Sequence, residues 1–429
     1  MIIQDDVKEY TIDLFNQYKK KHKYILNETI RDSPLIQKEM LDSLIEKYEL
    51  KESHLDQSSK YLLQELVTQY ITDIVNEYNY RKIMKQDLPN RLNKLKELKL
   101  PEQRSQEWYD IRDKMLTASS LADALGKGHF RTREELLIEK SSKEAIPRFT
   151  SDILEWGVKY EPVATTFYEK INNLKILEFG LVPHPQFTIF GASPDGICDI
   201  DSPEDYIGRM LEIKCPPRRQ FTKEVPEHYW MQMQGQLECC DLEECDFLQV
   251  KLLEYESEEE YKEDKLLEDD ILKEGLTSDN LPKGLVLSFI SFNNKDEKKY
   301  HYEYSEFYQS FTQLKDWSDT IILDYTEEYT EVKYHWWKIN HYECTLVHRD
   351  REWWLKTMPE ILNFWEDVEH YRKVGNQVLL DKKEERKNKR KANSQKKKAN
   401  QPSKKNIITI NQEINQLIET NYLLDSDTE

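Results

Sequence analysis

The pattern of apolar and polar positions predicts that the first hundred residues form helices. From about Ser59 to Tyr80 the apolar side chains recur every three or four positions, which places them on one face of an α-helix. Ser33-Pro34 gives an earlier helix an N-cap followed by proline in its first turn. No pattern of reactive side chains accompanies these helices. We therefore expect residues 1–100 to be a helical scaffold or a partner-binding region.

The pattern changes near Arg104, after which short apolar runs alternate with helical segments. A helix is predicted from about Ile153 to Asn172, and another begins near His228. The segments with strand composition are Ile176–Val182, Phe187–Gly191, Gly196–Ile200, Met210–Cys215 and Phe247–Leu253. Strands and helices mixed in this way predict an α/β (α+β) fold.

Aromatic residues dominate the segment from 284 to 373. Its predicted elements are strands near Leu285–Phe292, Tyr300–Tyr304 and Tyr334–Ile339, a helix from about Glu306 and a helix from about Glu352 to Tyr371. Aromatic side chains can stack on bases, but filling a core is their commoner use. The apolar pattern ends after Val374, so we expect residues 376–429 to be a disordered tail with one short helix over about 407–424.

Charge is unevenly distributed along the chain. The 429 residues carry a net charge of −19, which at first argues against a nucleic-acid partner. Residues 382–405 nevertheless contain twelve Lys or Arg against two Glu, whereas residues 254–270 contain ten acidic residues against two Lys. Because phosphate binding depends on local clusters of charge, the total excludes little.

These two charged segments have separate interpretations. We expect the acidic segment, over about 254–282, to be a solvated insertion. The basic segment 382–405 can serve as a nuclear localisation signal, as a nonspecific contact to DNA, or only as solvated chain.

The cysteines and the hydrophobic segments bear on the cellular compartment. None of the six Cys forms a Cys-x-x-Cys pair or neighbours His at zinc-ligand spacing. Cys215, Cys239 and Cys240 lie in surroundings typical of reduced core thiols. The N-terminus lacks the segments of a secretory signal, and no stretch approaches the roughly 20 apolar residues that cross a bilayer. We expect an intracellular protein with no membrane partner.

One stretch carries residues suited to metal-dependent chemistry. Asp195 lies on a Ser-Pro-Asp-Gly turn, and Glu212 and Lys214 follow on an apolar run, two positions apart. Side chains two apart on a strand share a face, so Glu212 and Lys214 project together and meet Asp195 if the strands pair. Two carboxylates about 4 Å apart repel each other by a few kcal/mol. The cluster implies a bound cation, with the carbonyl of Ile213 as an extra ligand, or a raised pKa.

A plainer interpretation is that Asp195 is a turn residue and that Glu212 and Lys214 are an exposed cross-strand pair. The run around Glu212 is apolar, however, and an unpaired charge in such a strand is costly, which favours a site. Mg²⁺ held by carboxylates activates water and relieves charge on a phosphodiester. The prediction is a divalent-metal nuclease centre in which Lys214 orients or deprotonates the attacking water.

A second candidate group precedes this stretch. Thr117 or Ser119 can cap a helix that ends near Gly126, and Arg112 lies seven residues before Ser119. A helix start with a hydroxyl and an arginine can bind a phosphate. A simple cap with a surface arginine explains the same residues.

Two helices carry further polar candidates. Glu161 is an ordinary helical acid unless Gly157, one turn earlier, lets a backbone or a ligand approach. Gln232 and Gln236 share a face of their helix, whereas Gln234 points elsewhere.

Taken in order, the motifs resemble a known family. They are Glu-Trp-x-x-x-Arg followed by Thr-Ala-Ser, then Gly-x-x-x-Glu, Ser-Pro-Asp-Gly, Leu-Glu-x-Lys-Cys-Pro and Tyr-x-x-Gln-x-Gln. This set, over about residues 104–250, resembles the YqaJ-like viral recombinase family, which is related to phage lambda exonuclease within the PD-(D/E)XK nuclease superfamily. The segment Val347–Trp353 is similar to the C-terminal part of members from large DNA viruses. The resemblance implies a restriction-endonuclease-like core, with a central mixed sheet flanked by helices, over residues 101–375.

The resemblance also implies a role for each motif residue. By this resemblance Asp195 and Glu212 match the metal ligands, and Glu161 matches the acid near a second metal. Lys214 matches the catalytic lysine, and Gln232 matches an active-site glutamine. Arg112 and Ser119 match the residues that grip a terminal 5′-phosphate. The implied activity is a deoxyribonuclease with two Mg²⁺ ions, for which Mn²⁺ can substitute, that digests one strand of duplex DNA from 5′ to 3′ in viral recombination, repair or end processing.

Relatives form ring trimers and work with a single-strand annealing protein, so a homo-oligomer, such a protein and double-stranded DNA ends are the expected partners. The expected location is the host nucleus or a cytoplasmic site of viral replication. Two other functions fit the same residues: a structure-specific or restriction-like endonuclease, and a non-catalytic DNA-binding scaffold. A scaffold would be indicated by loss of a motif residue, and none is missing.

Overall fold

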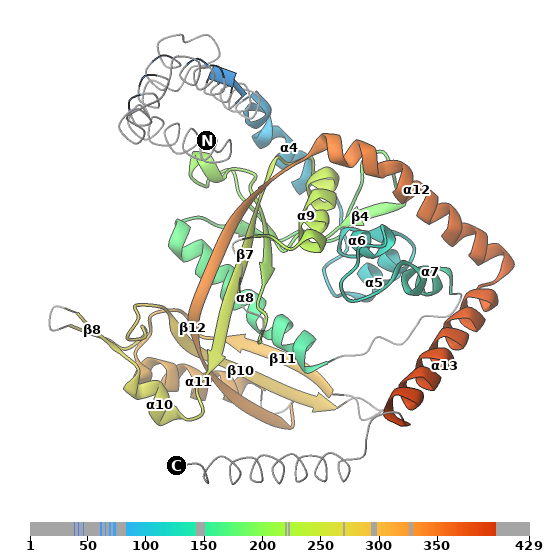
Figure 1. Cartoon of the computed structure of the whole chain (residues 1–429). Helices are drawn as coiled ribbons and strands as arrows, with labels where there is room; N and C mark the ends of the chain where they lie inside the picture. Colours follow the sequence, from blue (N-terminus) through green and yellow to red (C-terminus); the bar gives the residue numbers. More distant parts are fainter. Residues whose placement is uncertain are drawn as a thin grey trace, which may run out of the picture. The chain divides into compact units, whose positions relative to one another are not determined.

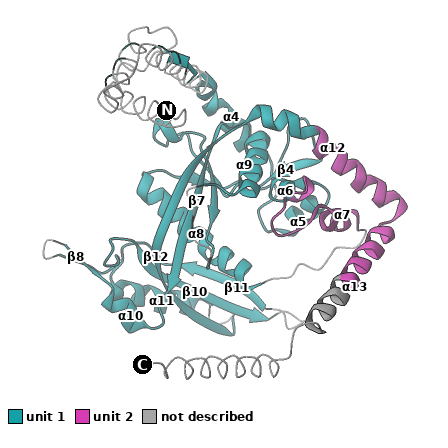
Figure 2. Ribbon diagram, viewed as in Figure 1, with its two compact units in different colours: residues 1–122, 148–358 teal, residues 123–147, 359–429 magenta. Residues whose placement is uncertain are grey.

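The computed structural model describes residues 83–142, 151–218, 224–268, 271–292, 298–325 and 329–399, together with Phe221 and scattered positions before residue 83. The chain divides into two compact units (Figure 2). The first contains residues 1–122 and 148–358, and the second contains residues 123–147 and 359–429. Every residue of the predicted site belongs to the first unit.

The first unit contains a seven-stranded mixed sheet, of which β7, β10, β11 and β12 are labelled in Figure 1. Its strands are arranged in the order β11-β10-β12-β7-β6-β5-β2. Strands β6 and β7 are parallel, and the other neighbouring pairs are antiparallel. The bounds are β2 Ile176–Leu177, β5 Gly196–Cys198, β6 Met210–Lys214, β7 Glu244–Glu254, β10 Lys283–Phe292, β11 Lys298–Tyr304 and β12 Glu331–His348. A mixed sheet flanked by helices confirms the predicted fold class.

Two smaller sheets complete the strand inventory of the described residues. The first has the order β1-β4-β3, with bounds Leu116–Thr117, Phe190–Ala192 and Val182–Pro183. The second is the hairpin of β8 Leu266–Glu268 and β9 Ile271–Lys273.

Helices α8 and α9 cover opposite faces of β6. Helix α8 (Asp152–Asn172) packs against Leu211 and Ile213 in one apolar cluster. Helix α9 (Glu227–Cys240) follows β6 in the chain, and the ring of its Tyr229 contacts Phe247 of β7. Because side chains alternate along a strand, Glu212 faces α9 while its two neighbours face α8.

The aromatic residues of the C-terminal half fill two cores. Trp337 of β12 is buried with α8, whereas Trp336 packs in a separate cluster on the other face of the sheet. That cluster also contains Tyr261 of α10 (Glu258–Glu263) and Leu314 of α11 (Phe311–Tyr325). The expected core use of the aromatics is therefore confirmed.

The acidic segment is more ordered than its charge suggests. We expected residues 254–282 to be a solvated insertion, but they contain α10 and the β8–β9 hairpin. Ser257 caps α10 by accepting from the backbone N–H of Glu260 at 3.1 Å, and Tyr261 is buried. The acidic side chains occupy the outward positions of a helix that one aromatic residue anchors.

Strand β12 is three times longer than predicted. It extends from Glu331 to His348, whereas the apolar run indicated only Tyr334–Ile339. Residues after 340 alternate polar and apolar side chains with one side exposed, and they pair with β7 after a register shift between Ile339 and His341. Such a strand carries too few apolar residues to be found by hydrophobicity.

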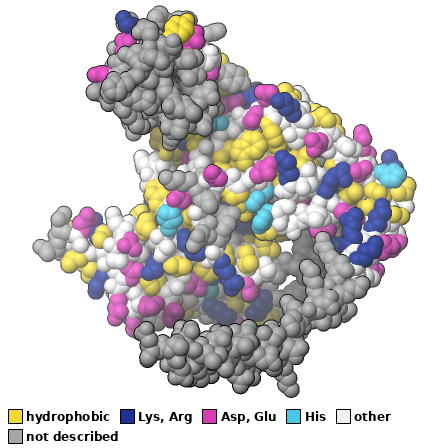
Figure 3. Space-filling model, in the orientation of Figure 1, with side chains coloured by type: hydrophobic (Ala, Val, Ile, Leu, Met, Phe, Trp, Pro, Cys, Tyr) yellow, Lys and Arg dark blue, Asp and Glu magenta, His cyan; other side chains and the backbone are white. Residues whose placement is uncertain are grey.

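The second unit is built from α7 (Arg133–Ser141), the end of α12 (Arg351–Val374) and α13 (Gln377–Ala399). Thr132 and Glu135 form a capping box at the start of α7. Asn376 donates to the carbonyl of Ile138 at 3.2 Å and Arg372 donates to that of Lys140 at 2.9 Å. Figure 3 shows Lys and Arg side chains gathered on one face over these helices.

Helix α13 corrects the expectation of a disordered basic tail. Residues 382–399 are helical, because Lys and Arg are good helix formers and alternate here with few helix-breaking residues. The helix predicted over 407–424 lies outside the described residues.

Most of the predicted N-terminal helices also lie outside the described residues. The positions described there, such as Asp42 and Asp73, are helical, and α4 spans Leu88–Lys96. The remaining helices are α5 Gln106–Asp113 and α6 Leu121–Ala124. Among the helices described, none combines the length and apolar character needed to cross a membrane.

Glu254, at the end of β7, attaches α8 to the sheet. Its carboxylate accepts from the ammonium of Lys159 and the hydroxyl of Tyr160, each at 2.5 Å, and lies 3.2 Å from Nδ1 of His335. Burial alone would raise the pKa of Glu254, but the hydrogen bonds from these three side chains outweigh it and hold the pKa at about 2.

This pKa predicts how Glu254 contributes to stability. The pKa of an unfolded glutamate is about 4.3, so the contribution is complete above about pH 5 and is lost as the pH falls toward 2. Glu254→Gln should lower the free energy of unfolding at pH 7, and its difference from the unmodified protein should shrink on acidification. Urea unfolding between pH 7 and pH 3 measures this difference, and a difference independent of pH would contradict the assignment.

Candidate active site

Glu212 is a fully buried carboxylate at the centre of the predicted site. Its side chain has 0% exposure. Oε1 accepts from the ammonium of Lys214 and from Nε2 of Gln232, the latter at 2.7 Å, and Oε2 accepts from Nε2 of Gln236 at 2.7 Å. Three donors from β6 and α9 thus take the place of water around one negative charge.

Lys214 lies on the same face of β6 as Glu212, as the two-residue spacing predicted. Its ammonium contacts Glu212 and lies 5.1 Å from the ring centroid of Tyr229. Burial alone would lower the pKa of Lys214, but Glu212 and Asp195 more than offset it, so the pKa is raised above its ordinary value. Lys214 is therefore a charged donor at neutral pH, which suits orienting a water or an oxyanion better than removing a proton.

Asp195 meets the same strand from the turn between β4 and β5. Its Oδ2 accepts from the backbone N–H of Ile213 at 2.7 Å. Burial raises the pKa of Asp195 well above its usual range, and the negative charges of Glu212 and Glu161 raise it further. The structure therefore brings Asp195, Glu212 and Lys214 together, as the pairing of the strands predicted.

Three side chains that sequence reasoning did not assign hold this turn. Nε1 of Trp108 donates to Oγ of Ser193 at 3.0 Å, and Nε2 of Gln103 donates to the carbonyl of Pro194 at 3.1 Å. Gln236 also lies 3.4 Å from the carbonyl of Ser193. Trp108 had a signal, its place in the Glu-Trp-x-x-x-Arg motif, whereas Gln103 had none.

Arg112 and Ser119 contact each other, as a shared anion site requires. Arg112 donates to Oγ of Ser119 at 3.2 Å, and its guanidinium lies 4.2 Å from the ring centroid of Trp108. Ser119 is exposed, whereas Thr117 is buried with its hydroxyl 3.1 Å from that of Ser119. Through Trp108 this pair is connected to the turn that carries Asp195.

The side-chain cap predicted as one alternative at Thr117 is not formed. Thr117 is the N-cap of a short 3₁₀ turn at Ala118–Ser120, and it makes no side-chain capping bond. Its hydroxyl is oriented toward Ser119 instead. The predicted stop at Gly126 is supported, because that residue has a φ of +73°.

Glu161 approaches from α8, and its charge acts on Glu212, Lys214 and Asp195. One terminal nitrogen of Arg104 lies 3.2 and 3.3 Å from its two oxygens. Burial raises the pKa of Glu161, and Arg104 acts most strongly to lower it. Among the described residues outside its own helix, no heavy atom lies within 4 Å of where a Cβ of Gly157 would stand, so no backbone uses that space.

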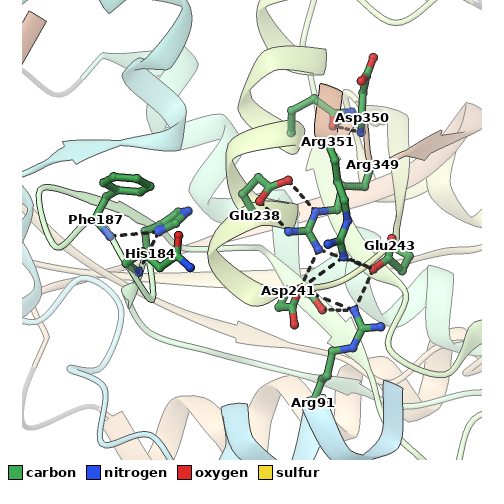
Figure 4. Close-up of polar contacts among 11 residues, drawn as sticks. Arg91, His184, Phe187, Glu238, Asp241, Glu243, Arg349, Asp350 and Arg351 are labelled. Atoms are coloured by element: carbon green, nitrogen blue, oxygen red, sulfur yellow. Dashed lines mark hydrogen bonds and ion pairs between the residues drawn. The ribbon is translucent and has the colours of Figure 1, made fainter. Parts of the chain in front are cut away.

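Gln234 points away from the site, as predicted, and holds the junction of β12 and α12. It donates to the carbonyl of His348 at 2.8 Å and accepts from the N–H of Asp350 at 2.6 Å. Beside this junction Arg349 donates to Glu238 and Asp241 within the cluster drawn in Figure 4. The charged residues of Val347–Trp353 therefore have internal partners, and this segment serves the fold.

The donor set fits a divalent cation in its chemistry. Asp195, Glu212 and the carbonyl of Ile213 supply oxygen atoms, the ligands that Mg²⁺ prefers. Burial raises the pKa of both Asp195 and Glu161, and a bound cation would favour their charged forms. In the described part of the chain, however, no three His, Cys, Asp or Glu side chains converge into a ready metal-binding group. Glu161 already has a cationic partner in Arg104.

A family model describes this part of the chain. Residues 107–243 match the YqaJ-like viral recombinase domain. Over these residues the chain resembles that family. All seven side chains predicted for the site fall within this segment, from Arg112 to Gln232.

Two viral proteins resemble the chain. Uncharacterized protein R354 of Acanthamoeba polyphaga mimivirus is 28% identical over 312 residues, which cover 67% of this chain and 56% of the relative. A protein of African swine fever virus (strain Badajoz 1971 Vero-adapted) is 26% identical over 163 residues, which cover 32% of this chain and 46% of the relative. The chain thus spans about half the length of these relatives.

Two solved structures are more distant in sequence. An alkaline exonuclease from Laribacter hongkongensis, LHK-Exo, shares 18% identity, with 65% of this chain and 99% of that chain covered and a TM-score of 0.36. A phage-related exonuclease from Haemophilus somnus 129PT shares 12% identity, with 62% and 96% covered and a TM-score of 0.32.

The contacts of Glu212 predict a coupling to Gln236. Gln236→Leu leaves Oε2 of a buried carboxylate without a donor, so we expect a loss of about 1–3 kcal/mol in the free energy of unfolding. In a Glu212→Gln background, which removes the charge, the same substitution should cost clearly less. Urea unfolding of the four proteins gives the coupling, and an equal cost in both backgrounds would rule it out.

Proposed function

We propose that this protein is a Mg²⁺-dependent deoxyribonuclease that digests one strand of duplex DNA from a phosphorylated 5′ end, in recombination, repair or end processing. The observation that carries the proposal is the buried Glu212 carboxylate held beside Lys214 and Asp195. A protein rarely buries such a charge unless the site uses it. The YqaJ-like domain over the same residues supports this interpretation.

The residues divide the chemistry among them. Asp195, Glu212 and the carbonyl of Ile213 would hold one ion, and Glu161 would contribute to a second. When bound, such ions activate water and neutralise charge on the phosphate, and Mn²⁺ can replace Mg²⁺. Gln232 and Gln236 fix the orientation of Glu212, so that its oxygens present one geometry to a ligand.

Lys214 donates rather than accepts in this scheme. Its raised pKa keeps it protonated, so it orients the attacking water and stabilises negative charge on the phosphate oxygens. The acceptor for the water proton is solvent or a carboxylate of the cluster.

Arg112 and Ser119 would select the DNA end. A guanidinium and a hydroxyl in contact supply charge-assisted hydrogen bonds suited to a terminal phosphate. The Trp108 contact to Ser193 connects this pair to the turn that carries Asp195. An end phosphate bound there would set the distance from the terminus to the cut.

Removal of the Lys214 ammonium tests the catalytic assignment. Lys214→Ala should lower Mg²⁺-dependent cleavage of linear duplex DNA by about 10²–10³-fold, while the variant still binds DNA. EDTA should abolish cleavage by the unmodified protein. Lys298→Ala, at an exposed lysine of β11, is the matched control. Undiminished cleavage by the Lys214 variant would refute the assignment, and cleavage of closed circular DNA would favour an endonuclease.

End chemistry tests the second group separately. The unmodified protein should digest 5′-phosphorylated ends faster than 5′-hydroxyl ends, and Arg112→Ala should reduce that preference by about ten- to a hundredfold because a charged hydrogen bond is lost. Ser119→Ala should reduce it less. A time course on duplexes labelled at one 5′ end measures both rates, and equal rates on the two ends would remove the proposed role.

A further inference from the structure

Arg104 occupies a backbone conformation that favours glycine. The N–H of Ser105 donates to the carbonyl of Glu102 at 3.1 Å, which closes a four-residue turn with Arg104 in its third position. The φ of Arg104 is +66°, and turns with a positive φ at this position usually place Gly there. A long side chain at such a position points to a role for that side chain.

The guanidinium of Arg104 contacts the carboxylate of Glu161. One terminal nitrogen lies 3.2 Å and 3.3 Å from the two oxygens of Glu161. The neighbouring Gln103 donates to the carbonyl of Pro194, in the turn that ends at Asp195. The turn that strains Arg104 is therefore fastened to the candidate active site.

An ordinary surface ion pair is the simpler interpretation. The side chains of Arg104 and Glu161 are 44% and 33% exposed, and exposed pairs add little to stability. An ion pair that adds little to the free energy of unfolding does not explain why an arginine occupies a backbone conformation that favours glycine. Glu161 also lies near enough to Asp195 to raise the pKa of that residue, yet it joins no ready metal-binding group among the described residues.

We propose that Arg104 is the resident counter-ion of Glu161 and competes with a divalent cation for that carboxylate. This inference rests on the proposed function, since it concerns the same metal site. One guanidinium nitrogen contacts both oxygens of Glu161, so a cation that binds this carboxylate must compete with that contact. Guanidinium groups also bind phosphate, so a DNA phosphate can take Arg104 from Glu161 and favour the second cation when substrate is present.

Two substitutions remove the guanidinium and suit the backbone. Arg104→Gly and Arg104→Asn are both compatible with a positive φ, so the fold should be retained. Mn²⁺ binding to the full chain, without DNA, is followed by electron paramagnetic resonance of the free ion. The weaker of two Mn²⁺ sites should tighten by about two- to fivefold in both variants, the range expected for an exposed ion pair.

Matched variants isolate the cause. Adding Glu161→Gln to Arg104→Gly should abolish the gain in Mn²⁺ affinity. Asn173→Gly, at a φ of +51° after α8, relieves a similar backbone position away from Arg104 and should leave Mn²⁺ binding unchanged. A 5′-phosphorylated duplex should reduce the difference between Arg104→Gly and the unmodified protein.

The outcomes separate the two proposals. Unchanged Mn²⁺ affinity in both Arg104 variants, with two sites in the unmodified protein, would overturn the counter-ion role and leave the proposed nuclease standing. Failure of the unmodified protein to bind Mn²⁺ or Mg²⁺, with no cleavage, would overturn both. A gain that persists with Glu161→Gln would place the competition at another carboxylate and contradict the assignment.

Discussion

The burial of one carboxylate governs the local structure of the candidate site. Glu212 lies where water cannot reach it, and leaving a charge there without partners would cost several kcal/mol. Lys214, Gln232 and Gln236 supply those partners from β6 and α9. The helix must therefore keep one rotation and one height relative to the strand, and the turn that carries Asp195 is fixed by contacts with both. The hydrogen bonds to Glu212 and the packing of α9 on β6 therefore favour the same placement of the helix.

The local parts of this arrangement were predictable from the sequence. Alternation along a strand placed Glu212 and Lys214 on one face, and turn chemistry placed Asp195 before its strand. Helical spacing separated Gln234 from its two neighbours. What could not be predicted was which distant side chain completes each group. Trp108 and Gln103 reach the turn only because α5 and the loop before it lie against it, and no local pattern encodes that placement.

The errors in the fold have a related origin. Hydrophobic periodicity detects elements with an apolar face, so it found α8, α9 and the centre of β12. The outer half of β12 and helix α10 are stabilised by pairing and by single aromatic anchors such as Tyr261. The local charge of the acidic and basic segments also led to wrong predictions, because α10 and α13 are highly charged and nevertheless helical. In each case tertiary contacts or backbone propensity outweighed polarity.

The position of β7 also affects what counts as a folding unit in this chain. The segment that matches the YqaJ-like domain ends at residue 243, one residue before β7 begins at Glu244. β7 is the parallel neighbour of β6, and it is covered on its other side by β12, whose pairing residues follow about a hundred positions later. A chain that stopped before β12 would leave a long, buried strand with an unpaired edge, the kind of surface that drives aggregation. The segment that carries the candidate chemistry and the segment able to fold by itself therefore have different boundaries, and during synthesis the site cannot become fully supported until residue 348 is available.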